Sequence, residues 1–197
     1  MKPNTPSLLS ANAPVLDAAA IDRALRRIAH EIIERNPDLG SVILAGIPSR
    51  GVEIAGRLAD LIESLGQVRV GTGAIDVSMH RDDVGTRPEL PRVQASTLPL
   101  PLENKTVIIV DDVLFTGRTV RAAIEALFDY GRPQRVQLAV LADRGHRELP
   151  IRPDYVGKNL PTSREERVYV RLEEVDGVDE VTIGGAGRRA AAGAGVS

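Results

Sequence analysis

The chain has 197 residues, a formal net charge of −2 and no cysteine. This length is typical of one domain with its own hydrophobic core. Without cysteine, disulfides and thiolate metal sites are excluded, and the charge argues against general binding of polyanions, so nucleic-acid contact would need a local basic patch. The apolar runs are too short to cross a bilayer and no signal-peptide pattern opens the chain, so we expect a soluble cytoplasmic protein.

Both ends of the chain are predicted to be flexible tails. Residues 1–14 are rich in proline and small polar residues, and residues 185–197 are a run of glycine and alanine. We therefore expect one domain over residues 15–184. Its first element is predicted to be an amphipathic helix between Asp17 and Asn36, where apolar residues recur at helical spacing.

A strand, a loop and a helix follow one another twice along the chain. The first unit is a predicted strand at residues 41–47 and a helix at 52–65, and the second is a strand at 106–110 and a helix at 117–130. This alternation predicts an α/β fold with a mainly parallel central sheet flanked by helices. In such sheets ligands bind beyond the carboxyl ends of the strands, where both loops fall.

The remaining segments are less regular. Residues 68–80 are predicted to form one or two strands, and residues 81–101, which hold four prolines, a long mobile loop. After the second helix we expect, in chain order, a strand at residues 135–142, an irregular polar segment at 143–163 and closing strands at 167–172 and 178–183.

The most informative stretch is VIIVDDVLFTGRT at residues 107–119, a buried strand followed by two acids, a small-residue turn and a helix start. Backbone N–H groups and the helix dipole at residues 116–119 can bind a phosphate, which Gly117 allows to come close. Asp111 and Asp112 can accept from ribose hydroxyls or hold Mg²⁺. The alternative is a strand that ends in an Asp-rich turn and a helix cap.

A second anion-binding loop is predicted at residues 46–51, GIPSRG. Gly46 and Gly51 flank a backbone that can approach an anion, and Arg50 can bind two oxygens at once. A surface turn with an exposed arginine is the alternative.

Residues 107–119 resemble the phosphoribosyl pyrophosphate (PRPP) loop of type I phosphoribosyltransferases, and further segments narrow the resemblance to the PyrR family of bifunctional pyrimidine operon regulators and uracil phosphoribosyltransferases. Those segments are RALRRIAHEIIERN at 23–36, GIPSRG at 46–51, IDVSMHRDD at 75–83, GRPQRVQLAVLADRGHRELPIRPDYVGKN at 131–159 and PTSREERV at 161–168. The resemblance covers residues 15–183 and implies the type I phosphoribosyltransferase fold, with a small hood and a flexible loop.

This resemblance implies an enzyme that makes UMP and pyrophosphate from uracil and PRPP with Mg²⁺. Catalytic roles would fall to Arg50, Asp111 and Asp112, and the two aspartates would hold the metal largely through substrate and water. The substrate-binding positions that it implies are Ser49, Arg50, Arg81, Asp111, Asp112, Val113, Leu114, Phe115, Thr116, Gly117, Arg118, Thr119, Arg144 and Val168. For Arg81, a solvated loop charge is the alternative, and for Arg144 a salt-bridged arginine.

Two positions depart from the family pattern. His80 and Phe115 stand where relatives commonly carry tyrosine, so a phenolic hydroxyl is absent at both. We assign neither residue a catalytic role. The missing hydroxyls put in doubt how the flexible loop, which would begin at Arg81, closes over the site.

The resemblance also implies binding to a stem-loop in the leader of pyrimidine operon mRNA, strengthened by the nucleotides UMP and UTP, which promotes transcription termination. The matching basic positions are Arg26, Arg27, His30, Arg147, Arg152 and Lys158. Clustered basic side chains could follow RNA phosphates, whereas a charged helix face is more often plain solvated surface. A uracil phosphoribosyltransferase without RNA regulation is therefore the alternative. The resemblance further suggests a homo-oligomer, a dimer or a tetramer.

Overall fold

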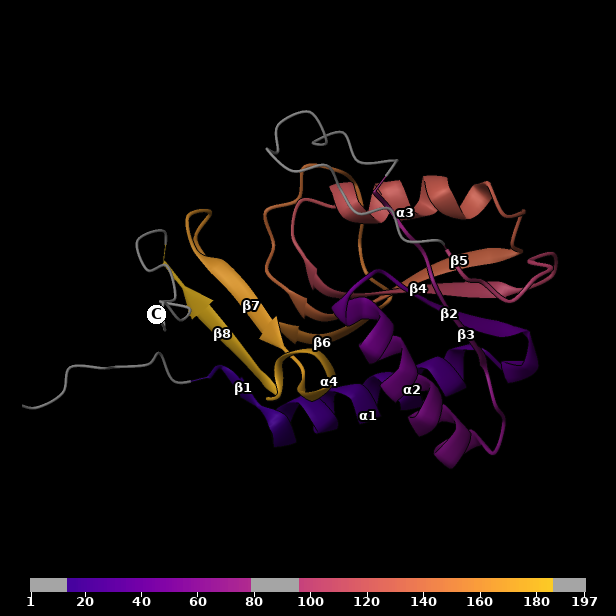
Figure 1. Ribbon diagram of the computed structural model, residues 1–197, viewed down its shortest axis with the longest axis horizontal. Helices are drawn as coiled ribbons and strands as arrows, with labels where there is room; N and C mark the ends of the chain where they lie inside the picture. Colours follow the sequence, from indigo (N-terminus) through magenta and orange to yellow (C-terminus); the bar gives the residue numbers. More distant parts are fainter. Residues whose placement is uncertain (1–13, 79–95, 186–197) are drawn as a thin grey trace, which may run out of the picture.

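The computed structural model describes residues 14–78 and 96–185, which form two sheets of unequal size. The larger sheet has five strands, all parallel, in the order β3-β2-β4-β5-β6, and the smaller one has three antiparallel strands in the order β1-β8-β7 (Figure 1). The elements are β1 (Leu16–Asp17), α1 (Ala18–Arg35), η1 (Leu39–Ser41), β2 (Val42–Gly46), α2 (Arg50–Gly66), β3 (Gly71–Ala74), β4 (Thr106–Leu114), α3 (Arg118–Phe128), β5 (Arg135–Asp143), β6 (Tyr155–Asn159), β7 (Arg167–Arg171), α4 (Glu173–Asp176) and β8 (Glu180–Gly184). None of the helices among these residues is long and apolar enough to cross a membrane.

Helices cover both faces of the larger sheet, with α3 on one face and α1 and α2 on the other (Figure 1). Successive side chains of a strand point to opposite faces. In β4, Ile108 and Val110 belong to the core under α1 and α2, whereas Val107 and Ile109 belong to the core under α3. Burial on both faces explains why β4 is apolar throughout residues 107–110 and β5 throughout residues 138–142.

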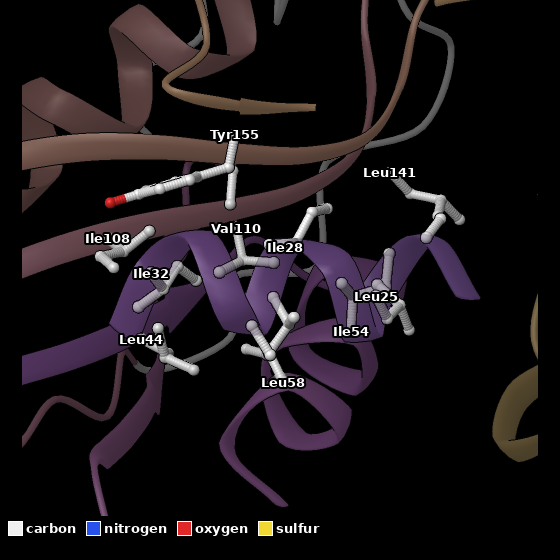
Figure 2. Packing of buried hydrophobic residues seen from close by; sticks show 14 of the residues in the cluster. Leu25, Ile28, Ile32, Leu44, Ile54, Leu58, Ile108, Val110, Leu141 and Tyr155 are labelled. Atoms are coloured by element: carbon white, nitrogen blue, oxygen red, sulfur yellow. The ribbon is translucent and has the colours of Figure 1, made fainter. Parts of the chain in front are cut away.

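The core beneath α1 and α2 joins the two helices to four neighbouring strands. Figure 2 shows its side chains from α1, α2, β2, β4, β5 and β6, among them Leu25, Ile28, Ile32, Leu44, Ile54, Leu58, Ile108, Val110, Leu141 and Tyr155. The only phenolic hydroxyl in this set, that of Tyr155, donates to the Gln137 side chain at 3.1 Å and accepts from the Asn36 amide at 3.0 Å. These two bonds satisfy a polar group that would otherwise cost free energy in the core.

The first helix follows its prediction closely. Asp17 caps it, because its carboxylate accepts from the Ala20 N–H at 2.8 Å. At the other end, the Asn36 N–H donates to the Ile32 carbonyl oxygen at 3.0 Å. The helix therefore begins and ends where local capping bonds are available, and these are readable from the sequence.

The strand β4 is longer than expected. It was predicted over residues 106–110, but its pairing with β5 continues to Leu114 opposite Asp143. Asp111 and Asp112 consequently lie inside a strand, so the predicted end of the strand at residue 110 was wrong. Pairing with a neighbouring strand, a tertiary effect, overrides the polarity of the two acids.

One further prediction needs correction. The segment 143–163 was expected to be irregular, yet it contains the edge strand β6. The segment 68–80, predicted to form one or two strands, holds one, the short strand β3, within the described residues. Thr97, in the predicted long loop, forms an antiparallel bridge with Ala74, which ties the end of that loop to β3. The rest of this loop up to residue 95, and the predicted tails apart from Pro14 and Gly185, lie outside the described residues.

The smaller sheet and α4 form a hood that is fastened to α2 by Arg57. The Arg57 guanidinium donates to both carboxylate oxygens of Glu174, at 2.7 and 2.6 Å, and to both of Asp179, at 2.8 and 2.7 Å. Bonding to Arg57 lowers the pKa of each carboxyl group, and their bonds raise the pKa of Arg57. We call these three residues the hood clamp.

Gly51→Ala is expected to destabilise the fold, because a Cβ at this position would lie 2.4 Å from the Val110 carbonyl oxygen. Overpacking of this kind costs about 1–3 kcal/mol. Gly56→Ala is the matched control in the same helix: its Cβ would meet nothing within 4 Å, and its higher helix propensity should add about 0.5–1 kcal/mol. Urea denaturation of both variants measures the difference, and equal stabilities would contradict the close approach at Gly51.

The hood clamp should weaken in acid. Because the pKa values of Glu174 and Asp179 are lowered in the folded protein, their contribution is fully present above the ordinary carboxyl pKa of about 4 and is lost as the pH falls through the lowered values. Arg57→Leu removes the clamp, so the gap in unfolding free energy between wild type and this variant should shrink from about pH 7 to about pH 3. A gap that stays constant over this range would show that the clamp does not contribute to stability.

Candidate active site

The loop after β2 lies against β4, the strand that carries Asp111 and Asp112. These strands are parallel neighbours, and Gly46 at the end of β2 is paired with Val110 in β4. The loop after β2 stays on β4, since the Ile47 N–H donates to the Val110 carbonyl oxygen at 2.9 Å, and it then enters α2. The predicted pyrophosphate loop therefore lies against the strand that carries the two aspartates.

The glycines of the GIPSRG loop have a structural role that was not predicted from the sequence. A Cβ at Gly46 would lie 2.5 Å from the Gly51 carbonyl oxygen, and a Cβ at Gly51 would lie 2.4 Å from that of Val110. Both residues therefore permit close packing of the protein backbone on itself. The predicted reason, approach of the backbone to an anion, is not needed to explain them.

Arg50 is the first residue of α2, and Ser49 is its N-cap. The Arg50 guanidinium forms a two-pronged ion pair with Asp176 at the end of α4, with Nε to Oδ2 at 3.0 Å and Nη2 to Oδ1 at 2.7 Å. This pairing raises the pKa of Arg50, as does the nearby charge of Asp112, and lowers the pKa of Asp176. Asp176 was not recognised from the sequence, where it is one acid in a polar segment.

The two aspartates of β4 bond to the strand itself. The Asp111 carboxylate accepts from the Asp112 N–H at 2.9 Å, and the Asp112 carboxylate accepts from the Val113 N–H at 2.8 Å. Asp111 is buried, with 7% of its surface exposed, whereas Asp112 is partly exposed. Asp112 lies near Arg50, since its charge contributes to the raised pKa of that arginine.

The turn between β4 and α3 ends in a helix N-terminus that can receive an anion. Val113 and Leu114 complete the strand, and Gly117, with φ +92°, takes the N-cap position in the left-handed conformation that favours glycine. The first turn of α3, all of it within the described part of the chain, holds no acidic residue and has no side-chain cap. Arg118 and Thr119 follow Gly117 directly, and their backbone is placed where the helix dipole is most positive.

The segment after β5 folds back over this turn. The Thr116 carbonyl oxygen accepts from the N–H groups of Glu148 and Leu149, at 3.0 and 3.2 Å. The Arg118 side chain forms an exposed ion pair with Glu148 at 2.9 Å. These bonds hold the candidate phosphate-binding turn from its outer side.

Arg144 lies between this turn and the hood. It is buried, with 6% exposed, and it donates to the Thr162 hydroxyl at 3.1 Å and to the Ser163 carbonyl oxygen at 2.8 Å. Its guanidinium stacks over the Phe115 ring, with Cζ 4.1 Å from the ring centre, and burial lowers its pKa. The stack was not foreseen from the sequence, because nothing in the local pattern of either residue reports the other. Val168 follows in β7, partly buried.

Four of the predicted RNA-binding residues lie on α1 and β6, where Arg26 pairs with Asp22 and Arg27 with Glu31. Arg26, Arg27 and His30 are exposed on α1, and Lys158 is exposed on β6, which packs against that helix. Arg27 also donates to the carbonyl oxygens of Val156 and Gly157, both at 2.7 Å. It therefore partly covers the open edge of the sheet.

Arg147 and Arg152 differ in their surroundings. The Arg147 guanidinium donates to the carbonyl oxygens of Phe115 at 2.9 Å and Ile151 at 3.0 Å, and it pairs with Asp143. It thus braces the segment after β5 from within, whereas Arg152 is exposed. Arg81, the remaining predicted site residue, lies outside the described residues, as does His80.

Residues 14–78 and 96–185 contain no group of three or more His, Cys, Asp or Glu side chains that could hold a metal ion. This agrees with the way Mg²⁺ is commonly bound beside phosphates, by one or two carboxylates together with substrate oxygens and water. Asp111 and Asp112 supply carboxylate oxygens of the hard type that Mg²⁺ prefers. They fit such a shared site and do not make a complete one.

Comparison with known proteins supports one family. The family model of the phosphoribosyl transferase domain matches residues 13–172. "Bifunctional protein PyrR" of Chloroflexus aurantiacus is 59% identical over 169 residues, covering 86% of this chain and 93% of that protein, and the protein of the same name from Halalkalibacterium halodurans is 54% identical over 171 residues, covering 86% and 95%.

Solved structures share the fold at much lower identity. A hypoxanthine phosphoribosyl transferase of Trypanosoma cruzi is 18% identical with a TM-score of 0.69, covering 92% of this chain and 94% of that one. A hypoxanthine phosphoribosyltransferase of Staphylococcus aureus is 21% identical with a TM-score of 0.61, covering 77% and 80%. With the relatives above, the parallel sheet and its paired loops assign this chain to the PyrR family of bifunctional regulators and uracil phosphoribosyltransferases.

Proposed function

We propose that this chain transfers the 5-phosphoribosyl group of PRPP to uracil, giving UMP and pyrophosphate, and that uridine nucleotides at the same site control its binding to pyrimidine operon leader mRNA. The main observation in support of phosphoribosyl transfer is the structure of the junction between β4 and α3. Two aspartates there precede a glycine-led helix N-terminus without an acidic residue in its first turn, beside the Arg50 loop.

In this proposal the 5-phosphate binds at the start of α3. Backbone N–H groups of residues 117–119 and the hydroxyls of Thr116 and Thr119 are the donors, and the helix dipole favours the negative charge. Arg118 contributes through its backbone, since its side chain is turned to Glu148. The turn is held by the segment after β5, so few donors must be reordered when the phosphate arrives.

The ribose and the pyrophosphate would lie between β4 and the start of α2. Asp111 and Asp112 accept from the ribose hydroxyls, and Ser49 and Arg50 face the pyrophosphate. Mg²⁺, bound to PRPP oxygens with Asp111 or Asp112 as protein ligand, would supply further neutralisation of the leaving group. As the bond from C1 to pyrophosphate breaks, positive charge develops on the ribosyl ring, and the two carboxylates stabilise it.

Uracil would enter between the β4–α3 turn and the hood. The stacked pair of Phe115 and Arg144 offers an apolar ring edge and a fixed cation, and the backbone near Val168 offers hydrogen-bond partners for the base. The loop that covers the site would begin at Arg81. Excluding water matters here because water would hydrolyse PRPP in place of transfer to the base.

The second half of the proposal rests on the basic side chains of Arg26, Arg27, His30 and Lys158. These side chains are exposed on α1 and β6, elements that pack together. Arg152 and Arg147 are the further candidates, with Arg147 the weaker one because its guanidinium is engaged inside the protein. We also propose that the chain acts in the cytoplasm as a homo-oligomer, a dimer or a tetramer.

Asp112→Asn should lower kcat for UMP formation by about 10²–10³-fold, because it removes a negative charge at the developing ribosyl cation. Its thermal unfolding should remain close to wild type. Asp60→Asn is a charge-matched control at an exposed position of α2, and it should keep full activity. Wild-type turnover in purified Asp112→Asn would overturn the assignment of this carboxylate.

Binding to the leader RNA should tighten with UMP and weaken with salt, since basic side chains that contact phosphates release counterions. In a gel shift, Lys158→Ala and Arg26→Ala should each bind more weakly and show a shallower salt dependence. Arg132→Ala, an exposed arginine in the turn between α3 and β5, is the control and should bind like wild type. Affinity that does not change with salt would contradict the phosphate-contact model.

A further inference from the structure

We propose that Asp176 is a positioning residue for phosphoribosyl transfer, which holds the Arg50 guanidinium from the hood side so that its remaining N–H groups face the pyrophosphate of PRPP. The inference rests on the proposed function, in which Arg50 binds pyrophosphate. Asp176 is separated from Arg50 by most of the chain, and no sequence pattern connects the two.

The contact between them has defined geometry. Both oxygens of Asp176 are used, with Nε to Oδ2 at 3.0 Å and Nη2 to Oδ1 at 2.7 Å. A guanidinium carries five N–H groups, of which this pair takes two, so the edge that includes Nη1 remains to meet a second anion. One arginine can in this way be gripped by a carboxylate on one edge and present the other edge to a phosphate.

Asp176 is itself anchored to the core. Its Oδ2 accepts from the Leu172 N–H at 2.9 Å, and the Leu172 side chain is fully buried. The bonds thus run from a buried point of the hood through Asp176 to the guanidinium. A support of this kind restricts a long side chain that would otherwise lose rotamer freedom only when the ligand binds.

The hood does not need this ion pair to stay on α2. Arg57, further along the same helix, already binds Glu174 and Asp179 on either side of Asp176 in sequence. Figure 1 shows α4 beside α2. The ion pairs of Arg50 with Asp176 and of Arg57 with Glu174 connect these two helices. The hood clamp holds the two elements together, so the Asp176 contact is available for a separate role at the site.

Because Asp176 is negatively charged, it would weaken pyrophosphate binding if it contributed nothing else to the site. A carboxylate beside a site for pyrophosphate repels that anion, and near a protein surface such repulsion is substantial. Asp112 already supplies negative charge near Arg50. A second carboxylate on the same arginine is explained if the free energy gained by ordering the guanidinium exceeds the free energy lost by repelling the ligand.

The test is Asp176→Asn, which removes the charge and leaves a side-chain oxygen for the Leu172 N–H. It should raise the KM for PRPP and the inhibition constant of magnesium pyrophosphate by about two- to tenfold, the cost of ordering one long side chain on binding. The KM for uracil should stay unchanged. Asp179→Asn makes the same charge change in the same segment, on Arg57, and should leave all three constants at their wild-type values.

A double variant separates positioning from a structural effect. If Asp176 acts through Arg50, then Arg50→Ala with Asp176→Asn should bind magnesium pyrophosphate no more weakly than Arg50→Ala alone. Additive losses would overturn the inference, and so would an equal loss in Asp179→Asn. Unchanged or tighter binding in Asp176→Asn, alongside weakened binding in Arg50→Ala, would reject the role of Asp176 alone. No loss in Arg50→Ala would reject the proposed role of Arg50 as well.

Discussion

The first turn of α2 can lie against the middle of β4 only because residue 51 has no side chain. The Val110 carbonyl oxygen occupies the space where a Cβ would be, and the same oxygen accepts from the Ile47 N–H. This contact brings the GIPSRG loop beside Asp111 and Asp112. Without it, the arginine at the helix start and the carboxylates of the strand would belong to separate surfaces, and no single ligand could meet both.

Charge in the site is organised in pairs that span different elements. Arg50 carries an acid of the hood on one edge and lies near Asp112 of β4, while Arg144 is desolvated against the Phe115 ring. The substrate proposed here is a polyanion, and it would enter a site whose cations already have protein partners. On binding, the substrate oxygens would share or replace these protein partners. Because the arginine side chains are already held in place, little conformational entropy is lost when the substrate binds.

Arginine serves two distinct purposes on the surface that would meet RNA. Arg27 and Arg147 bond to backbone carbonyl oxygens of the protein, and so stabilise the sheet edge and the segment after β5. Arg26 and Lys158 are exposed and make no such bonds to the backbone among the described residues, while the Arg26 guanidinium pairs with the exposed Asp22 carboxylate at 3.4 Å. A basic position in the sequence is therefore only a candidate for RNA contact, and the bonds it makes within the fold determine how much of its charge is available to RNA.

Features that depend on local chemistry could be predicted from the sequence. The limits of α1 follow from its period and from capping by Asp17 and Asn36, and the α/β class and the turn before α3 follow from the alternation of elements and from Gly117. The length of β4, the existence of β6 and the ion pair of Arg50 with Asp176 could be known only from the folded chain. The physical reason is that strand pairing and side-chain contacts join residues far apart in the chain, and no local propensity or spacing encodes such partners.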